Sequence, residues 1–201
     1  MPNLSFEGRR HLEDALDRKR GVLCVSAHLG SIELGAAGMA RFGRVHSVAG
    51  IQLHGPWTLS VRSRLHAWGV DLYQGPWSYR RMERALRNGG LAALPLDGDQ
   101  ALARRPAPFL GTQLHLPLGP AWLAARTGAA VLPTACLLTE SGWNLIFHPP
   151  IKPDESSESS AAAWHLAIAR AVEGLILAAP DQWVLPSPLI DYSFTSLADS
   201  G

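Results

Sequence analysis

Gly21-Val-Leu-Cys-Val-Ser-Ala-His-Leu-Gly-Ser-Ile-Glu33 is the stretch that decides the fold of this chain of 201 residues. Its first seven residues form an almost continuous apolar run, which is typical of a strand buried on both faces. Gly30 allows a tight turn, and Ser31 is a suitable N-cap for a helix from Ile32 to about Arg41. A strand, a tight turn and a helix in this order predict the opening of an α/β unit.

Strand-like and helix-like segments alternate along the rest of the chain. Strands are predicted at residues 45–49, 70–73, 91–96, 130–138 and 143–148, and helices at residues 7–20, 57–68, 78–88, 120–127 and 161–179. The last two strands are expected to be antiparallel, and residues 97–118 are expected to form a long loop. The alternation predicts an α/β fold with a mixed sheet flanked by helices. We expect one domain over residues 1–201, with an irregular tail at residues 186–201.

Composition excludes several classes of protein. The chain is 47% hydrophobic and 17% charged, which excludes a disordered or collagen-like chain. A formal net charge of +1 argues against nucleic-acid binding through a basic face. We find no run of 18 apolar residues and no signal-peptide-like N-terminus, so a soluble chain without a transmembrane helix is expected.

Cysteine and histidine spacing does not predict a metal site. Cys24 and Cys136 lie in apolar strand-like runs, without a C-x-x-C motif, and are expected to be buried free thiols. None of the histidines has His-Glu-x-x-His spacing, so no zinc site is expected.

His28 and Glu33 lie at the junction between the first buried strand and its helix. Catalytic groups in open α/β sheets gather at the carboxyl ends of strands, and a histidine there suits general base catalysis. Glu33 is expected to hold one imidazole nitrogen. Because the chain has no Gly-x-Ser-x-Gly motif, the hydroxyl activated by His28 would belong to a substrate, as in direct acyl transfer.

These residues also resemble a known family. Ser26-Ala-His-Leu-Gly-Ser-Ile-Glu33 is similar to the His-x4-Asp/Glu box of glycerolipid-type acyltransferases, and more closely to that of the bacterial lipid A biosynthesis (lauroyl/myristoyl) acyltransferases. Similar segments follow in the same order at Gly89–Gln100, Arg105–Gly111, Pro117–Pro133 and Asn144–Pro150. The resemblance extends over roughly residues 5–183.

The resemblance implies a glycerolipid-acyltransferase-like fold and an O-acyltransferase activity. The donor would be an acyl-carrier-protein or CoA thioester, acting as co-substrate with no other cofactor. The acceptor would be a hydroxyl of a lipid or glycolipid. His28 would be the general base with Glu33 as its orienting partner, and Arg64, or its neighbour Arg62, would bind acceptor phosphate.

Four further residues are expected to bind substrate on the same grounds. Asp97 and Asp99 match an acidic motif that would position arginine or backbone groups, and Arg105 and Gly111 bound a segment resembling the family's Phe-Phe-Gly stretch. Asp97-Gly-Asp99 also resembles the Asp-x-Asp of metal-dependent glycosyltransferases, which is the alternative enzyme class. A turn is the simplest interpretation of these three residues.

The chain departs from the family in three places. Ser31 and Ile32 replace the usual Asn-Trp, and the basic cluster expected just after Trp183 is replaced by Val184-Leu-Pro-Ser-Pro-Leu189. The family resemblance implies an N-terminal membrane anchor before the region that begins here, so we expect either that this chain lacks it or that the chain is a fragment. A non-catalytic, lipid-binding domain is therefore a second alternative.

Arginine and tryptophan suggest where such a protein works. Arg80, Arg84 and Arg87 share one face of a predicted helix, and Trp68 and Trp77 lie nearby in sequence. This face suits an acidic carrier protein or lipid phosphates, although a solvated basic face is the simpler interpretation. We expect a peripheral protein at the cytoplasmic side of the inner membrane that does not bind nucleic acid.

Overall fold

The computed structural model describes residues 3–48, 56–98, 103–153 and 160–184. Their centre is a seven-stranded sheet with the order β1-β9-β8-β2-β5-β3-β4. Its strands are β1 (Leu4–Glu7), β2 (Val22–Ser26), β3 (Val45–Val48), β4 (Val70–Tyr73), β5 (Leu91–Pro95), β8 (Ala130–Thr139) and β9 (Gly142–Phe147). Only the β8–β9 pair is antiparallel, so the predicted mixed sheet is confirmed.

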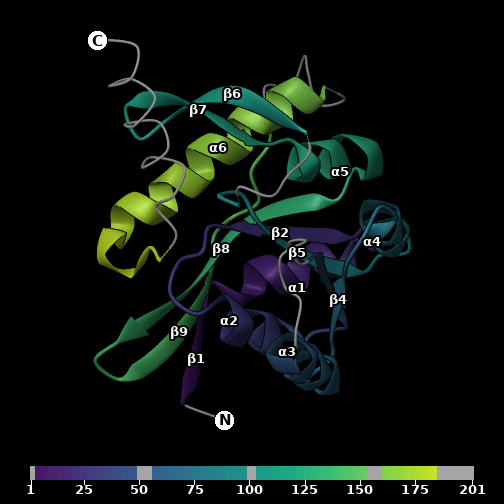
Figure 1. Ribbon diagram of the computed structural model, residues 1–201, viewed down its shortest axis with the longest axis vertical. Coiled ribbons are helices and arrows are strands. Elements are labelled where there is room, and N and C mark those ends of the chain that lie inside the picture. The colour runs from purple at the N-terminus through teal and green to yellow at the C-terminus, as the bar shows by residue number, and fades with distance from the viewer. Residues whose placement is uncertain (1–2, 49–55, 99–102, 154–159, 185–201) are drawn as a thin grey trace.

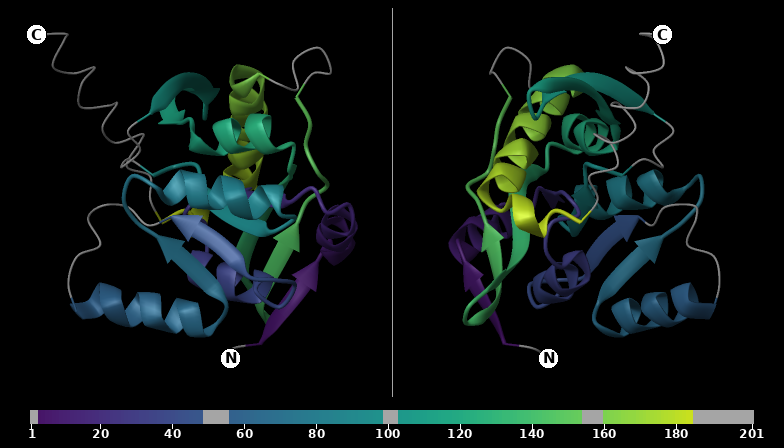
Figure 2. Two further views of the ribbon diagram at one scale, coloured as in Figure 1. Left: turned by 90° about the vertical axis from the view of Figure 1, so that its right-hand side faces the viewer. Right: turned by 60° about the vertical axis from the view of Figure 1, so that its left-hand side comes forward.

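Helices cover both faces of this sheet (Figures 1 and 2). They are α1 (Arg9–Asp17), α2 (Ile32–Met39), α3 (Pro56–Ala67), α4 (Ser78–Arg87), α5 (Gly119–Thr127) and α6 (Ala161–Ala178). The first three lie on one face, and α4, α5 and α6 lie on the other. Because parallel crossovers are right-handed, the chain changes face when it reverses direction across the sheet after β4.

Strand β2 explains why the sheet is buried on both sides. Val22 and Cys24 pack toward α1 and α2, whereas Leu23 and Val25 pack toward α5 and α6. All four side chains are essentially inaccessible to water. A strand covered on both faces needs apolar residues at successive positions, which is the pattern seen in the sequence.

The predicted loop at residues 97–118 is wrong in part, because it contains a β-hairpin. Strands β6 (Arg104–Phe109) and β7 (Thr112–Pro117) pair with each other and pack against α6. Pro106 and Pro108 hide the strand pattern in the sequence, yet both are exposed, while Ala107 and Phe109 between them are buried. Proline is tolerated at such edge positions.

Strand β1 was also missed, and the helix predicted at residues 7–20 is shorter than expected. Gly8 separates the two elements with a φ of 62°, and a Cβ there would lie 2.0 Å from the carbonyl oxygen of Phe147. The break therefore depends on a glycine that fits closely against β9.

Helix α6 is a core helix in this fold. Trp164, Ile168, Val172 and Ile176 are buried on the face that it turns to the sheet and the hairpin. By length and composition alone it could also span a membrane, which differs from the expectation that the chain has no transmembrane helix. Among the described helices it is the one that meets this test.

Candidate active site

His28 and Asp97 meet at the carboxyl edge of the sheet. Strands β2 and β5 are parallel neighbours in which Ser26 is paired with Pro95, so the residues two positions further on lie side by side. From this edge the chain leaves β2 toward one face of the sheet and β5 toward the other. Such a point of divergence is where open α/β sheets bind their ligands.

A dense set of hydrogen bonds joins the two residues. His28 Nδ1 lies 2.7 Å from Asp97 Oδ1, and the backbone N–H of His28 donates to both carboxylate oxygens at 3.0 and 2.9 Å. Asp97 has no exposed surface, whereas the His28 side chain is 26% exposed. Because a carboxylate accepts, Nδ1 carries the proton in neutral His28 and Nε2 carries the lone pair.

The turn after His28 is fixed by close backbone contacts. Gly30 has a φ of 63°, and a Cβ there would lie 2.0 Å from the carbonyl oxygen of Cys136. The Ser31 N–H donates to this same oxygen at 3.0 Å, and Ser31 Oγ accepts from Leu34 N as the predicted N-cap of α2. Since glycine alone fits here, the turn holds His28 in one position relative to β8.

An apolar cavity of about 200 Å³ opens beside His28, between the sheet and helices α2 and α3. His28, Ser31 and Glu33 line it at the carboxyl edge of the sheet. Leu65, near the end of α3, and Val70, which begins β4, line it near the opposite edge. The cavity therefore extends beneath α2 from the histidine along the sheet.

The two carboxylates near His28 differ in their contacts. Glu33 was predicted to orient the imidazole, but the hydrogen bond at Nδ1 goes to Asp97. Glu33 is exposed on the first turn of α2 and lines the same cavity. The partner of Nδ1 could not be found from spacing, because Asp97 lies 69 positions away in the sequence. The orienting role of Glu33 stays a prediction.

The two arginines predicted to bind phosphate differ in their surroundings. Arg62 is half-buried, and its guanidinium donates to Gln74 Oε1 at 2.7 Å. Gln74 follows β4 and therefore lies at the carboxyl edge, as His28 does. Arg64 is exposed on α3. Neither assignment is tested by these contacts.

The other predicted substrate-binding residues are more distant or lie outside the described residues. Arg105 is exposed on β6, and Gly111 is exposed at the tip of the hairpin. The hairpin packs against α6, on the sheet face opposite the cavity. Asp99 and the tail at residues 186–201 lie outside the described residues.

The Asp-x-Asp metal site receives no support from Asp97. Both of its oxygens accept hydrogen bonds from His28, and Oδ2 also accepts from the indole of Trp183 at 2.8 Å. In the residues that the structure describes, no group of three or more His, Cys, Asp or Glu side chains could hold a metal ion. The geometry instead places the His28 side chain, hydrogen-bonded to Asp97, beside an apolar cavity.

Both cysteines line this cavity as free thiols, as predicted. Burial raises the pKa of the Cys136 thiol to about 12. Burial raises the pKa of Cys24 to about 12 as well, against the opposing effect of a hydrogen bond with Thr134. The cavity wall therefore contains sulfur in its neutral form.

Comparison with known proteins shows the family of this chain. The model of the bacterial lipid A biosynthesis acyltransferase family matches residues 2–188, and the chain belongs to this family. It is 28% identical over 200 residues to a phosphatidylinositol mannoside acyltransferase of Mycobacterium tuberculosis, with 90% of this chain and 58% of that protein covered. A protein of the same name from Mycolicibacterium smegmatis is 26% identical over 203 residues, with 89% and 59% covered. The chain thus spans less than two thirds of these relatives.

We predict that both thiols resist a water-soluble disulfide reagent in the folded protein. At about pH 8 a thiol with a pKa of about 12 is ionised on the order of once in ten thousand molecules, and the thiolate is the reactive form. Release of the coloured reagent product should therefore be very slow before unfolding. Two equivalents should appear rapidly in concentrated guanidinium chloride, and rapid labelling of the folded protein would contradict the buried cavity wall.

Proposed function

We propose that this chain transfers a fatty acyl group from a thioester donor to a hydroxyl of a glycolipid. The observation that carries the proposal is the Asp97–His28 pair beside an apolar cavity in a member of this family. The donor is a CoA or acyl-carrier-protein thioester, which share the reacting group. The named activity of the similar mycobacterial proteins supports a phosphatidylinositol mannoside as acceptor.

His28 acts first as base and then as acid. Its Nε2 takes the proton of the acceptor hydroxyl while the oxygen attacks the thioester carbonyl carbon. The carbon–sulfur bond then breaks, and the departing thiolate takes the proton from the imidazolium. A thioester is already reactive, so orientation and one general base supply most of what the reaction needs.

Asp97 keeps His28 in the required tautomer during this sequence. Its carboxylate accepts a hydrogen bond from the Nδ1–H of His28, with 2.7 Å between Nδ1 and Oδ1, and stabilises the positive charge that develops on the ring. Glu33 is a second carboxylate at the same end of the cavity, and we propose that it favours the imidazolium through its charge. Asp97 is then the stronger determinant of the two, because it is buried and bonded.

The acyl chain enters the cavity beneath α2. Its lining is mostly apolar, including Ile32, Ala36 and Met39 on α2 and Val61 and Leu65 on α3. Such a surface favours a hydrocarbon chain, because each methylene removed from water contributes about 0.8 kcal/mol. The thioester carbonyl would then lie at the end where His28 is found.

Between the two candidate arginines, the structure favours Arg62 as the ligand of acceptor phosphate. Its bond to Gln74 holds the guanidinium at the edge of the sheet that also carries His28. An arginine held in this way presents a planar fork of donors to a phosphate. Arg64 remains the alternative suggested by the resemblance.

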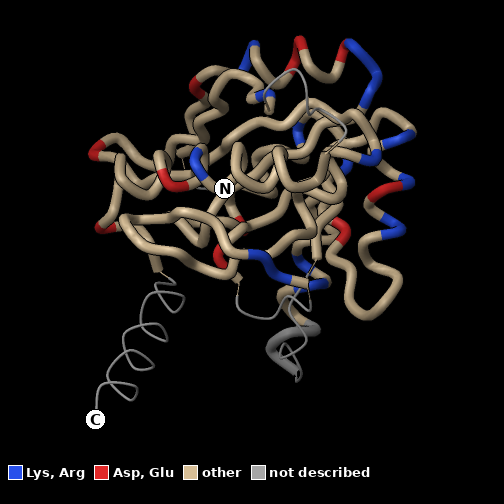
Figure 3. Tube along the Cα trace, turned by 90° about the horizontal axis from the view of Figure 1, so that it is seen from above, with Lys and Arg blue, Asp and Glu red and all other residues tan. Residues whose placement is uncertain are grey.

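We further propose that helix α4 meets an anionic membrane surface. Basic positions gather toward the side of the molecule at the right of Figure 3, and acidic ones are more frequent at the left. Arg80, Arg81 and Arg84 are exposed on α4, and the Arg80 guanidinium lies over the ring of Trp77, which is 62% exposed. Exposed tryptophan and arginine together suit a membrane interface.

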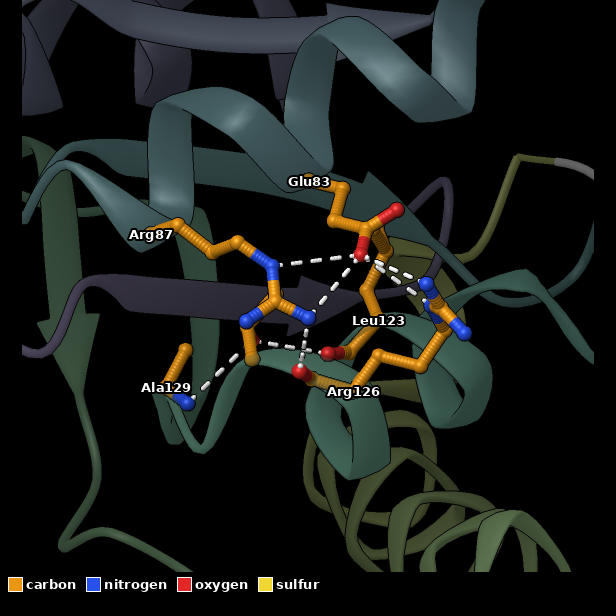
Figure 4. A network of polar contacts seen from close by, with 6 residues as sticks. Glu83, Arg87, Leu123, Arg126 and Ala129 are labelled. Carbon is orange, nitrogen blue, oxygen red and sulfur yellow. Dashed lines mark hydrogen bonds and ion pairs between the residues drawn. The ribbon is translucent and has the colours of Figure 1, made fainter.

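One arginine of α4, Arg87, is held by contacts within the protein and is not part of the proposed membrane-binding surface. Glu83 bonds both Arg87 and Arg126, and Arg87 also donates to the carbonyl oxygen of Arg126 (Figure 4). Partial burial opposes ionisation of Glu83, but these two arginines outweigh it and lower its pKa. Arg87 is therefore a structural residue joining α4 to α5.

The proposal that the protein works at the cytoplasmic side of the inner membrane rests on the family resemblance alone.

Replacing the carboxylates should distinguish their roles. We predict that His28→Gln lowers kcat by roughly a hundredfold to ten-thousandfold, the usual contribution of a general base. Asp97→Asn should cost roughly a hundredfold or more through the wrong tautomer, and Glu33→Gln roughly tenfold. The assay follows acylation of phosphatidylinositol mannoside from palmitoyl-CoA by mass spectrometry, and thermal unfolding verifies each fold.

A larger loss of kcat in Glu33→Gln than in Asp97→Asn would give Glu33 the orienting role. Thioester binding without turnover in the wild type would favour the non-catalytic, lipid-binding domain.

Filling the cavity should change the preferred acyl chain. Ala36→Phe places a large ring where α2 lines the cavity, so we predict a shift of kcat/KM toward shorter acyl-CoA donors. Ala36→Ser keeps the size of the side chain and should keep the wild-type preference. If both variants rank donors as the wild type does, the acyl chain binds elsewhere.

Vesicle binding should separate the two kinds of arginine on α4. One arginine near an anionic surface contributes about 1 kcal/mol, so Arg80→Gln should weaken binding to vesicles containing phosphatidylglycerol about fivefold. Arg87→Gln removes the same charge from a residue held by Glu83 and should have a smaller effect. Sedimentation with neutral vesicles is the control, and equal losses for both variants would contradict a defined docking surface.

A further inference from the structure

The chain after α6 returns across the turn after β2, residues 28–31, which we name the catalytic turn. Residues Gln182–Val184, which we name the strap, begin at the last residue of the short 3-10 helix Pro180–Gln182. Gly30 N donates to the Gln182 carbonyl oxygen at 2.9 Å, and Val184 N donates to the His28 carbonyl oxygen at 2.9 Å. Leu29 and Trp183 are paired between these two bonds, as in an antiparallel ladder. The strap therefore holds the residues on both sides of Leu29.

The strap is itself anchored to strand β8. The side-chain amide of Gln182 accepts from Leu138 N at 2.8 Å and donates to Leu138 O at 3.0 Å, so it imitates a backbone partner. The catalytic turn thus has β8 on one side, through the contact of Gly30 with Cys136, and the strap on the other. These two hydrogen bonds from one side chain fix the position of the strap relative to β8.

Trp183 extends from the strap to the carboxylate that orients His28. Its indole N–H donates to Asp97 Oδ2 at 2.8 Å, while His28 Nδ1 bonds Oδ1 at 2.7 Å. Within the described part of the chain, the other donor to Oδ2 is the backbone N–H of His28, which it shares with Oδ1. Because each carboxylate oxygen of Asp97 accepts from a different side chain, the carboxylate is hindered from rotating about its Cβ–Cγ bond.

We propose that Trp183 is a positioning residue of this active site. It acts through Asp97, because its indole N–H fixes the carboxylate so that Oδ1 faces His28 Nδ1. The strap adds the backbone bonds that keep the catalytic turn against β8. The assignment rests on the proposed function, since it presumes that His28 is the base.

A packing role and a positioning role predict different results. Trp183 is half-buried and contacts the main core, so its ring also contributes to stability. If packing is its only role, loss of the N–H matters little while the ring remains. If it positions Asp97, loss of the N–H alone lowers turnover and leaves donor binding unchanged.

The first experiment removes the N–H in two ways. Trp183→Phe keeps an aromatic ring, and incorporation of benzothienylalanine at position 183 keeps the bicyclic shape with sulfur in place of N–H. We expect kcat with palmitoyl-CoA and phosphatidylinositol mannoside to fall about tenfold in both, with the KM for palmitoyl-CoA unchanged. Trp143→Phe, at a half-buried tryptophan on β9, is the matched control and should keep wild-type turnover. Wild-type kcat in the benzothienylalanine protein would overturn the proposal, even where Trp183→Phe fails to fold.

The second experiment needs no substrate. A proton held between His28 Nδ1 and Asp97 gives a low-field NMR signal, identified by its loss in His28→Gln. We expect this signal to broaden through faster exchange with water in both position-183 variants and to stay sharp in Trp143→Phe. An unchanged signal in the variants, or no such signal in the wild type, would overturn the proposal. If the wild type shows no acyl transfer, the proposed function fails, and the NMR result still decides whether Trp183 positions Asp97.

Discussion

The buried carboxylate of Asp97 is the constraint around which this structure is organised. A charge without access to water costs several kcal/mol unless donors surround it. The donors here come from the turn after β2 and from the segment after α6, which are far apart in the sequence. Folding satisfies Asp97 only when β2, β5 and the end of α6 are all in place. Alignment of the histidine is therefore a result of completing the fold and needs no separate step.

The topology of the sheet makes this meeting possible. Strands β2 and β5 are neighbours although α2, β3, α3, β4 and α4 lie between them in the chain. The chain leaves β2 to build one face of the sheet and leaves β5 to build the other, so the two connections diverge at the edge between these strands. Membership of the lipid A biosynthesis acyltransferase family is consistent with this edge as the reaction site.

Local pattern was enough to predict part of the architecture and of the site. The apolar run of β2, the glycine turn and the Ser31 N-cap are properties of adjacent residues, and all three were found from the sequence. The partner of His28 is different, because proximity of Asp97 depends on strand order and not on spacing. Glu33 was predicted to orient His28 because it lies only five positions away in the sequence. Trp183 carried no recognisable signal, and the prolines of β6 concealed a hairpin whose alternate residues are buried.

The two thiols in the cavity wall have a consequence for the thioester chemistry that we propose for this chain. A thiolate exchanges readily with a thioester, so an ionised cysteine in that wall would capture the acyl group as a dead-end adduct on the protein itself. Because burial raises the pKa of Cys24 and Cys136 to about 12, both sulfurs stay protonated at neutral pH. The apolar environment that would bind a hydrocarbon chain therefore also keeps both thiols in their unreactive, protonated form. If the proposed thioester binds in this cavity, its acyl group is therefore not transferred to either cysteine of the wall.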